Sequence, residues 1–248
     1  MMNLPNITKN ILLLNILVWF FDVMFQRYGV QLYTLLGLHY VTAADFRWWQ
    51  PITYMFMHGG FSHLFCNMFA VLMFGPVLEQ AWGGKKFLLY YIICGIGAAV
   101  IQEAVWAIHI QSLLTQYSAS SVMANYAGQV VTVGASGAVF GILLAFGWLF
   151  PDVPMFLLFL PIPVRARTFV ILYALVELFA GFSNLPGDNV AHFAHLGGML
   201  FGIILLVWWQ YKQRLLDKIH WPWFSKHQRL DSSKDKDYSN YHYHRRED

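Results

Sequence analysis

The sequence is poor in charge and in cysteine. Only 12% of its 248 residues are Asp, Glu, Lys or Arg, about half the share of a soluble domain. Cys66 and Cys94 both lie inside apolar segments, so the chain offers neither a disulfide framework nor a cysteine zinc site. It also lacks a basic stripe for nucleic acid and a Gly-rich phosphate loop after a strand. These absences speak against a disulfide scaffold, a nucleic-acid-binding protein and a nucleotide-binding enzyme.

Apolar residues are abundant: 58% of the chain is hydrophobic, and the mean hydropathy is +0.48. A soluble chain of this length could not bury that much apolar surface, so we expect an all-α membrane protein with six transmembrane helices. The runs lack the two-residue alternation of membrane-spanning strands. The predicted spans are about 9–26, 59–80, 86–108, 134–151, 167–183 and 189–209. Residues 1–209 form the predicted membrane domain, and residues 210–248 a polar, partly disordered cytoplasmic tail.

The positions of Lys and Arg predict the orientation of the spans. Only Arg27 and Arg47 fall outside if the N-terminus is cytoplasmic. The inside set is Lys9, Lys85, Lys86, Arg165, Arg167 and nine residues after position 209. The positive-inside rule therefore predicts that both termini are cytoplasmic. Since no organelle-targeting segment is evident, the expected location is the cytoplasmic (inner) membrane of a bacterium.

Polar side chains inside predicted spans are candidate functional groups, because burying them in lipid is costly. His63 and Asn67 are four residues apart and share one face of the second span. Ser136 lies near the outer end of the fourth span, and His192 and His195 lie in the first two turns of the sixth. Polar groups from three spans thus reach a similar depth, just below the outer surface, and we expect them to meet.

Glycines give these spans a reason to touch. Small residues four apart allow close helix contact in membranes, and they occur as Gly137 and Gly141 on the fourth span and as Gly198 and Gly202 on the sixth. On the sixth span this glycine face also carries His195. A close partner helix bearing Ser136 would bring its hydroxyl within hydrogen-bond reach of that imidazole.

A serine hydroxyl becomes a good nucleophile when a base takes its proton, and histidine is the usual base. We therefore expect Ser136 as nucleophile and His195 as base, with His192 one turn nearer the aqueous boundary. The backbone N–H of Ser136, the Asn67 amide and the His63 imidazole could stabilise the oxyanion.

No carboxylate is expected at this depth. Glu79 is sixteen residues inward of His63, which is about 24 Å along a helix. Glu103 and Glu177 lie on other spans, where we expect structural hydrogen bonds. A Ser–His dyad is therefore expected rather than a triad.

Two other readings of these groups are weaker. His63, His192 and His195 could hold a metal or haem, but no Cys or Asp accompanies them, so no metal or cofactor is expected. A transporter would require a repeat or a pair of broken helices, and neither is visible.

Three segments resemble motifs of the rhomboid family of intramembrane proteases. Residues 134–141, GASGAVFG, resemble the family's GxSG motif, and residues 195–202, HLGGMLFG, resemble its sixth-helix motif. Residues 58–67, HGGFSHLFCN, resemble its second-helix pattern, and Glu79 matches a structural glutamate at the inner end of that helix. The resemblance covers about residues 9–209, in order.

The resemblance implies a six-helix rhomboid-like bundle that hydrolyses peptide bonds in or near transmembrane helices of membrane-protein substrates, within the bilayer and without metal or cofactor. It implies catalytic roles for Ser136 and His195, an oxyanion hole at His63 and Asn67, and a structural role for His58. The alternative is an inactive rhomboid-like binding or quality-control protein, against which the intact Ser136 and His195 argue.

The sequence departs from the family pattern at two positions. Many relatives have Trp-Arg in the first loop where this chain has Trp49 and Gln50, so a loop-anchoring arginine is missing. Phe140 occupies a place where some relatives carry tyrosine. It could stack on His195 but offers no hydroxyl.

Overall fold

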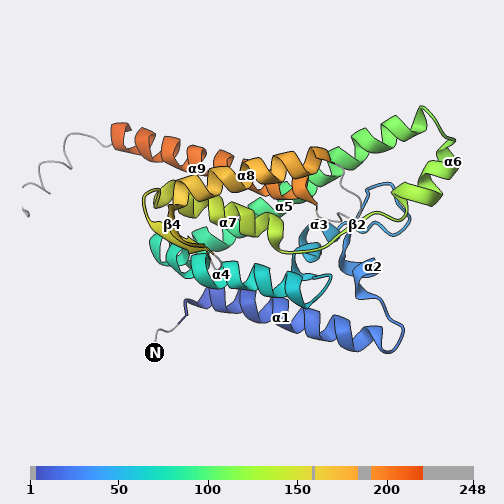
Figure 1. Ribbon diagram of the computed structural model, residues 1–248, viewed down its shortest axis with the longest axis horizontal. Helices are drawn as coiled ribbons and strands as arrows, with labels where there is room; N and C mark the ends of the chain where they lie inside the picture. The colour runs from blue at the N-terminus through green and yellow to red at the C-terminus, as the bar shows by residue number, and fades with distance from the viewer. Residues whose placement is uncertain (1–3, 158–159, 184–190, 220–248) are drawn as a thin grey trace, which may run out of the picture. The chain divides into compact units, whose positions relative to one another are not determined.

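A computed structural model describes residues 4–157, 160–183 and 191–219 (Figure 1). The chain is mostly helical. Its longer helices are α1 (Asn6–Gln26), α4 (Phe61–Trp82), α5 (Gly84–Leu114), α7 (Ser136–Leu149), α8 (Ala166–Ser183) and α9 (His192–Ile219). Its short helical turns are α2 (Leu32–Leu36), α3 (Gln50–Thr53), η1 (Tyr54–Phe56), α6 (Ala119–Val122) and η2 (Met123–Ala127).

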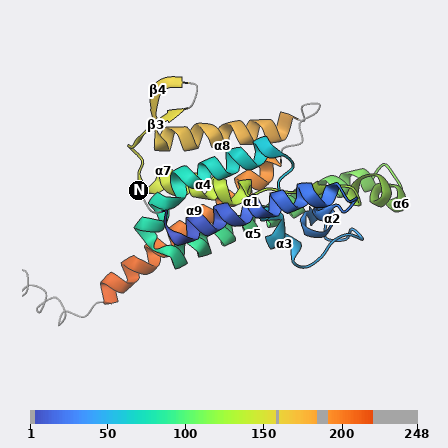
Figure 2. The same ribbon diagram turned by 90° about the horizontal axis from the view of Figure 1, so that it is seen from below.

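The described residues also contain two small antiparallel sheets, so the chain is not entirely helical as predicted. Strand β1 (Leu38–His39) pairs with β2 (Val131–Thr132), which ties the first loop to the segment before α7. Strands β3 (Pro154–Leu157) and β4 (Leu160–Arg165) form a ribbon between α7 and α8, visible at the top of Figure 2.

Within the part of the chain that the structure describes, five helices have the length and hydropathy of membrane spans: α1, α4, α5, α8 and residues 192–212 of α9. The predicted fourth span, 134–151, contracts to the 14 residues of α7. At 1.5 Å per residue α7 is about 21 Å long, whereas the hydrocarbon core is about 30 Å thick. The prediction of six full spans is therefore not confirmed, although the chain is a multi-pass membrane protein.

Helix α7 can be short because other helices enclose it. It packs against α4, α5 and α8, and every residue from Gly137 to Gly147 is buried. A helix that is apolar all round and surrounded by protein need not reach both aqueous surfaces. Its first residue, Ser136, is consequently placed inside the bundle.

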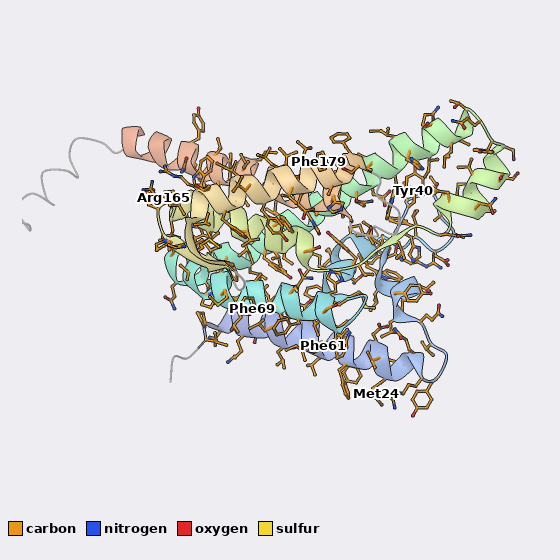
Figure 3. All side chains as sticks on the ribbon, viewed as in Figure 1. Met24, Tyr40, Phe61, Phe69, Arg165 and Phe179 are labelled. Carbon is orange, nitrogen blue, oxygen red and sulfur yellow. The ribbon has the colours of Figure 1, made fainter. Side chains whose placement is uncertain are left out.

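The outer helices present apolar side chains outward. Helix α1 packs on α4 (Figures 1 and 2). Helix α8 is the most peripheral of the candidate spans, because 17% of its most apolar 18-residue stretch is buried, compared with 44% for α5. Phe61 and Phe179 project from the bundle (Figure 3) and are 66% and 76% exposed. Such a surface suits lipid rather than water.

Glu79 joins α4 to the start of α1. Its carboxylate accepts hydrogen bonds from the backbone N–H of Ile7 at 3.0 Å and of Thr8 at 2.7 Å, and from the Thr8 hydroxyl at 2.8 Å. A negative charge at a helix N-terminus satisfies unpaired N–H groups and complements the helix dipole. The structure thus gives Glu79 helix-capping contacts at the end of α4 opposite His63.

Gln50 anchors the first loop in place of the missing arginine. The side chain is fully buried. Its amide donates to the carbonyl of Asp45 at 2.8 Å, and its oxygen accepts from the backbone N–H of His39 at 3.3 Å. The carboxylate of Glu103 adds a second attachment by accepting from the N–H of Val41 at 3.0 Å.

The chain divides into a unit of residues 1–205 and a second unit of residues 206–248. In the second unit α9 continues to Ile219, ten residues past the predicted end of the membrane domain at 209. Residues 220–248 lie outside the described residues, so the character of most of the predicted tail stays a prediction.

Candidate active site

Gly134 sets the start of α7. Its φ of +131° lies in the region that favours glycine, and its N–H donates to the carbonyl of Tyr54 at 2.9 Å. A Cβ at this position would lie 2.7 Å from the His63 ring. Any side chain here would therefore meet both backbone strain and a clash. The helix begins two residues later, at Ser136.

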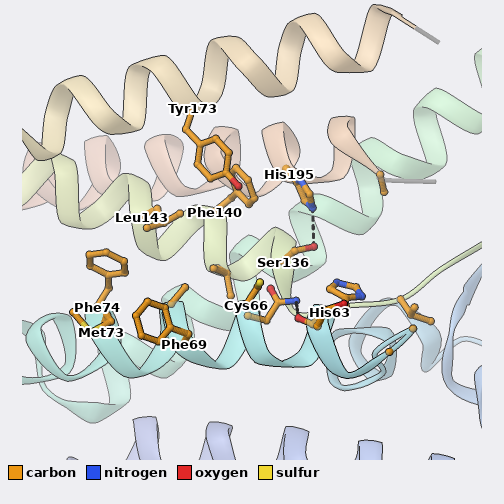
Figure 4. A pocket seen from close by; sticks show the side chains of 18 of the residues that line it. His63, Cys66, Phe69, Met73, Phe74, Ser136, Phe140, Leu143, Tyr173 and His195 are labelled. Carbon is orange, nitrogen blue, oxygen red and sulfur yellow. Dashed lines mark hydrogen bonds between the residues drawn. The ribbon is translucent and has the colours of Figure 1, made fainter. Parts of the chain in front are cut away.

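Ser136 meets His195, although the two residues are 59 positions apart. The Ser136 Oγ lies 2.8 Å from the His195 Nε2 (Figure 4), well within hydrogen-bond length. His195 is 8% exposed, whereas Ser136 is partly exposed. The pair is therefore held by packing on one side and open to a cavity on the other.

The two glycine pairs allow this approach. A Cβ on Gly198 would lie 2.7 Å from the carbonyl carbon of Gly137 and closer still to its oxygen. Gly141 is similarly close to Cys94, and Gly202 is close to Tyr90. Helices α7 and α9 thus touch backbone to backbone one turn below the Ser136–His195 contact.

Phe140 fixes the plane of the His195 ring. The rings of Phe140 and His195 are stacked, with centroids 4.3 Å apart and planes 9° apart, and Tyr173 on α8 packs against the same phenyl ring at 4.9 Å. A phenyl ring therefore makes the stacking contact in this chain, without a hydroxyl group.

The prediction that no carboxylate lies at this depth is wrong. The Glu177 Oε2 on α8 is 2.8 Å from the Nδ1 of His195 and 2.7 Å from the Nδ1 of His192. Glu177 is 5% exposed. Helices α8 and α9 run in opposite directions (Figure 1), so residues at similar distances from the end of α8 and the start of α9 come together. Counting from that segment could have found Glu177, six residues before the end of α8 at Ser183.

His63 and Asn67 lie in the wall of the same cavity. The Asn67 amide donates to the carbonyl of His63 at 3.0 Å, and Asn67 is 5% exposed. His58 packs edge-on against the His63 ring at 5.1 Å. Burial, with a smaller effect of neighbouring His63, lowers the pKa of His58 to about 3, so His58 is neutral at physiological pH.

The cavity between α4, α7 and α8 has a volume of about 960 Å³. Its polar end holds the groups predicted to act on a substrate, and its other walls are mainly apolar (Figure 4). The polar set is His63, Asn67, Ser136 and His195, and the apolar set includes Phe69, Met73, Leu143 and Phe169. The shape suits an apolar segment whose polar backbone is presented to Ser136.

The structure brings together a possible metal-binding cluster that differs from the set of histidines considered from the sequence. Among the described residues, Glu177, His192 and His195 have ligand atoms within 4.8 Å of one another, and His63 is not part of this group. The Glu177 contacts to both imidazoles already have hydrogen-bond lengths. The second nitrogen of His195 faces Ser136. A hydrogen-bond network therefore accounts for the cluster.

Comparisons with known proteins show which family the sequence resembles. The family model described as Rhomboid domain matches residues 45–211. RHOMBOID-like protein 5 of Arabidopsis thaliana is 32% identical over 165 residues, which are 66% of this chain and 46% of that protein. Rhomboid protease AarA of Providencia stuartii is 29% identical over 216 residues, 81% of this chain and 71% of that protein. RHOMBOID-like protein 4 of Arabidopsis thaliana is 31% identical over 157 residues, 63% of this chain and 33% of that protein. The chain thus spans less than half the length of the two plant relatives.

Proposed function

The chain belongs to the rhomboid family, and we propose that it is an intramembrane serine protease with Ser136 as nucleophile and His195 as general base. The observation that carries the proposal is the 2.8 Å contact between the Ser136 Oγ and the His195 Nε2 at the polar end of the cavity. The likeness to Rhomboid protease AarA supports the same activity.

The chemistry follows from this contact. The proton of Ser136 passes to the Nε2 of His195 while the Oγ bonds to the carbonyl carbon of the substrate, whose oxygen becomes an oxyanion. The imidazolium then gives that proton to the leaving amine as the C–N bond breaks. Water, deprotonated by the same base, hydrolyses the acyl-enzyme and restores Ser136.

Three groups would stabilise the oxyanion. The N–H of Ser136 belongs to the first turn of α7, where N–H groups lack helical acceptors and the helix dipole favours negative charge. The Asn67 amide and the His63 imidazole supply side-chain donors from α4. Their places in the cavity wall support this role.

The proposed substrates are membrane proteins with a transmembrane helix that can unwind near Ser136. A helix buries its peptide bonds in its own hydrogen bonds, so a serine nucleophile requires a locally extended segment. The apolar walls around Phe69, Met73 and Phe169 would bind the substrate's side chains. The polar end would then bind the exposed carbonyl.

We place the protein in the cytoplasmic membrane of a bacterium, with both termini in the cytoplasm. The asymmetry of Lys and Arg supports this orientation. A reporter fused after Asp248 should read as cytoplasmic, and one inserted near Ser120 as external. An external C-terminus would reverse the proposed depth of Ser136.

Cleavage of a model transmembrane substrate by detergent-solubilised protein tests the activity. Ser136→Ala should abolish cleavage and labelling by a fluorophosphonate, whereas Ser183→Ala, at the exposed end of α8, should leave both unchanged. EDTA should have no effect. A wild-type protein with neither cleavage nor labelling would instead be the inactive, binding type of rhomboid-like protein.

A further inference from the structure

Glu177 completes a continuous path of hydrogen bonds that begins at the proposed nucleophile. The Ser136 Oγ lies 2.8 Å from one nitrogen of His195, and the other nitrogen lies 2.8 Å from the Glu177 Oε2. The three side chains come from α7, α9 and α8. The path is well shielded, since Glu177 is 5% exposed and His195 is 8% exposed.

We infer that Glu177 is a positioning residue for His195, so that this protease works with a Ser–His–Glu relay; the inference rests on the proposed function. A carboxylate only accepts hydrogen bonds. The proton of neutral His195 therefore resides on Nδ1, and its Nε2 presents a lone pair to Ser136. This is the tautomer that a general base requires.

The charge of Glu177 also acts after proton transfer. Once Nε2 has taken the Ser136 proton, the imidazole is a cation within hydrogen-bond distance of a carboxylate. Charges interact more strongly in a buried site than in water, so the carboxylate stabilises the ion pair of imidazolium and oxyanion that forms in the transition state. Glu177 remains ionised throughout.

His192 holds the carboxylate in place. Its Nδ1 donates to the same Oε2 atom at 2.7 Å, one turn of α9 before His195. Two donors from one helix thus converge on a single oxygen of the neighbouring helix. This arrangement restricts rotation of the Glu177 side chain and aligns it with His195.

A purely structural role, in which Glu177 only ties α8 to α9, makes a different prediction. A glutamine could keep that tie through its amide oxygen while losing the charge. In Glu177→Gln we expect kcat to fall at least about tenfold, toward the ~10⁴-fold loss known for amide replacement in a serine-protease triad, with KM within about twofold. Glu177→Asp, which restores the charge, should be more active than Glu177→Gln.

The experiment compares kcat, KM and the rate of fluorophosphonate labelling in full-length protein in detergent. The matched control is Glu103→Gln, since Glu103 is a membrane-helix glutamate bound to the Val41 N–H. The labelling rate should fall with kcat in Glu177→Gln but not in Glu103→Gln. A loss below tenfold in Glu177→Gln, or an equal loss in Glu103→Gln, would overturn the inference.

A second measurement, made on the wild-type protein, is informative even if the Glu177→Gln variant folds poorly. It also separates this inference from the proposed function. Nitrogen-15 NMR of histidine-labelled wild-type protein should show His195 protonated on Nδ1 and unprotonated on Nε2 at mildly alkaline pH. A folded wild type with the opposite tautomer contradicts the role of Glu177 even if cleavage is normal. Cleavage by Ser136→Ala would instead refute the proposed function and leave the tautomer result standing.

Discussion

Replacing Gly198 by alanine should disable the protein through a displacement of about one ångström. The added Cβ would lie 2.7 Å from the Gly137 carbonyl carbon, whereas carbon atoms in contact normally lie about 3.5–4.0 Å apart. Both partners are helix backbone, so no side chain can turn away. Helices α7 and α9 must separate by about 1 Å to relieve the overlap.

That separation acts directly on the proposed catalytic pair. Ser136 precedes Gly137, and His195 is one turn before Gly198, so the 2.8 Å contact would lengthen to about 3.8 Å, beyond hydrogen-bond range. A misplacement of this size costs about 10²-fold in rate. Overpacking should also destabilise the protein by about 1–3 kcal/mol. We expect kcat to fall far more than the accompanying decrease in melting temperature would explain.

Cleavage kinetics and thermal melting in detergent test this prediction. Leu200→Ala is the matched control, because Leu200 lies on the same helix, two residues from Gly198, and is 47% exposed. KM should change little in Gly198→Ala, since α4 and α8 contribute much of the apolar cavity wall. A folded Gly198→Ala protein with more than half the wild-type kcat would refute the reasoning.

Three further predictions concern other described residues. Asn67→Ala should lower kcat about 10²–10³-fold at unchanged melting temperature; normal kinetics would remove Asn67 from the oxyanion site. Gln50→Ala leaves buried groups of the first loop unpaired and should cost about 1–3 kcal/mol, whereas Gln129→Ala, at an exposed position, should cost nothing measurable. His58 stays neutral in the folded protein down to about pH 3 but gains a proton in the unfolded chain near pH 6.5, so it makes stability fall as pH falls between these values. The loss approaches about 1.4 kcal/mol per pH unit; His58→Phe should therefore lose less melting temperature than wild type between pH 6.5 and 4.5, and equal losses would contradict this.

The candidate site was only partly predictable from the sequence. The helical spacing of the glycines and the positions of Ser136 and His195 within their predicted spans were enough to predict that these two side chains meet. In the structure they lie 2.8 Å apart. The same reasoning missed Glu177, because each glutamate was judged on its own span. Its depth becomes informative only when α8 and α9 are taken as antiparallel neighbours.

The first loop illustrates a second limit. The sequence showed that a loop-anchoring arginine is missing at position 50 but not what replaces its contacts, and in the structure Gln50 is fully buried and bound to the loop backbone. Whether an amide can replace a guanidinium depends on how the carbonyl of Asp45 and the N–H of His39 approach it. Those positions are set by the turns around α3, which local propensity does not specify.

The sequence by itself indicated that lipid surrounds the chain, located the long helices and singled out Ser136 and His195 as the proposed catalytic pair. A membrane span requires a continuous run of apolar residues of sufficient length, and such a run can be recognised from the local sequence alone. The tertiary structure alone decided that other helices enclose the short α7 and that Glu177 contacts His195. Both depend on contacts between helices that are distant in the chain. Helices α4, α5 and α8 enclose α7. The pairing of α8 with α9 brings the carboxylate of Glu177 to the imidazole of His195, 18 residues away.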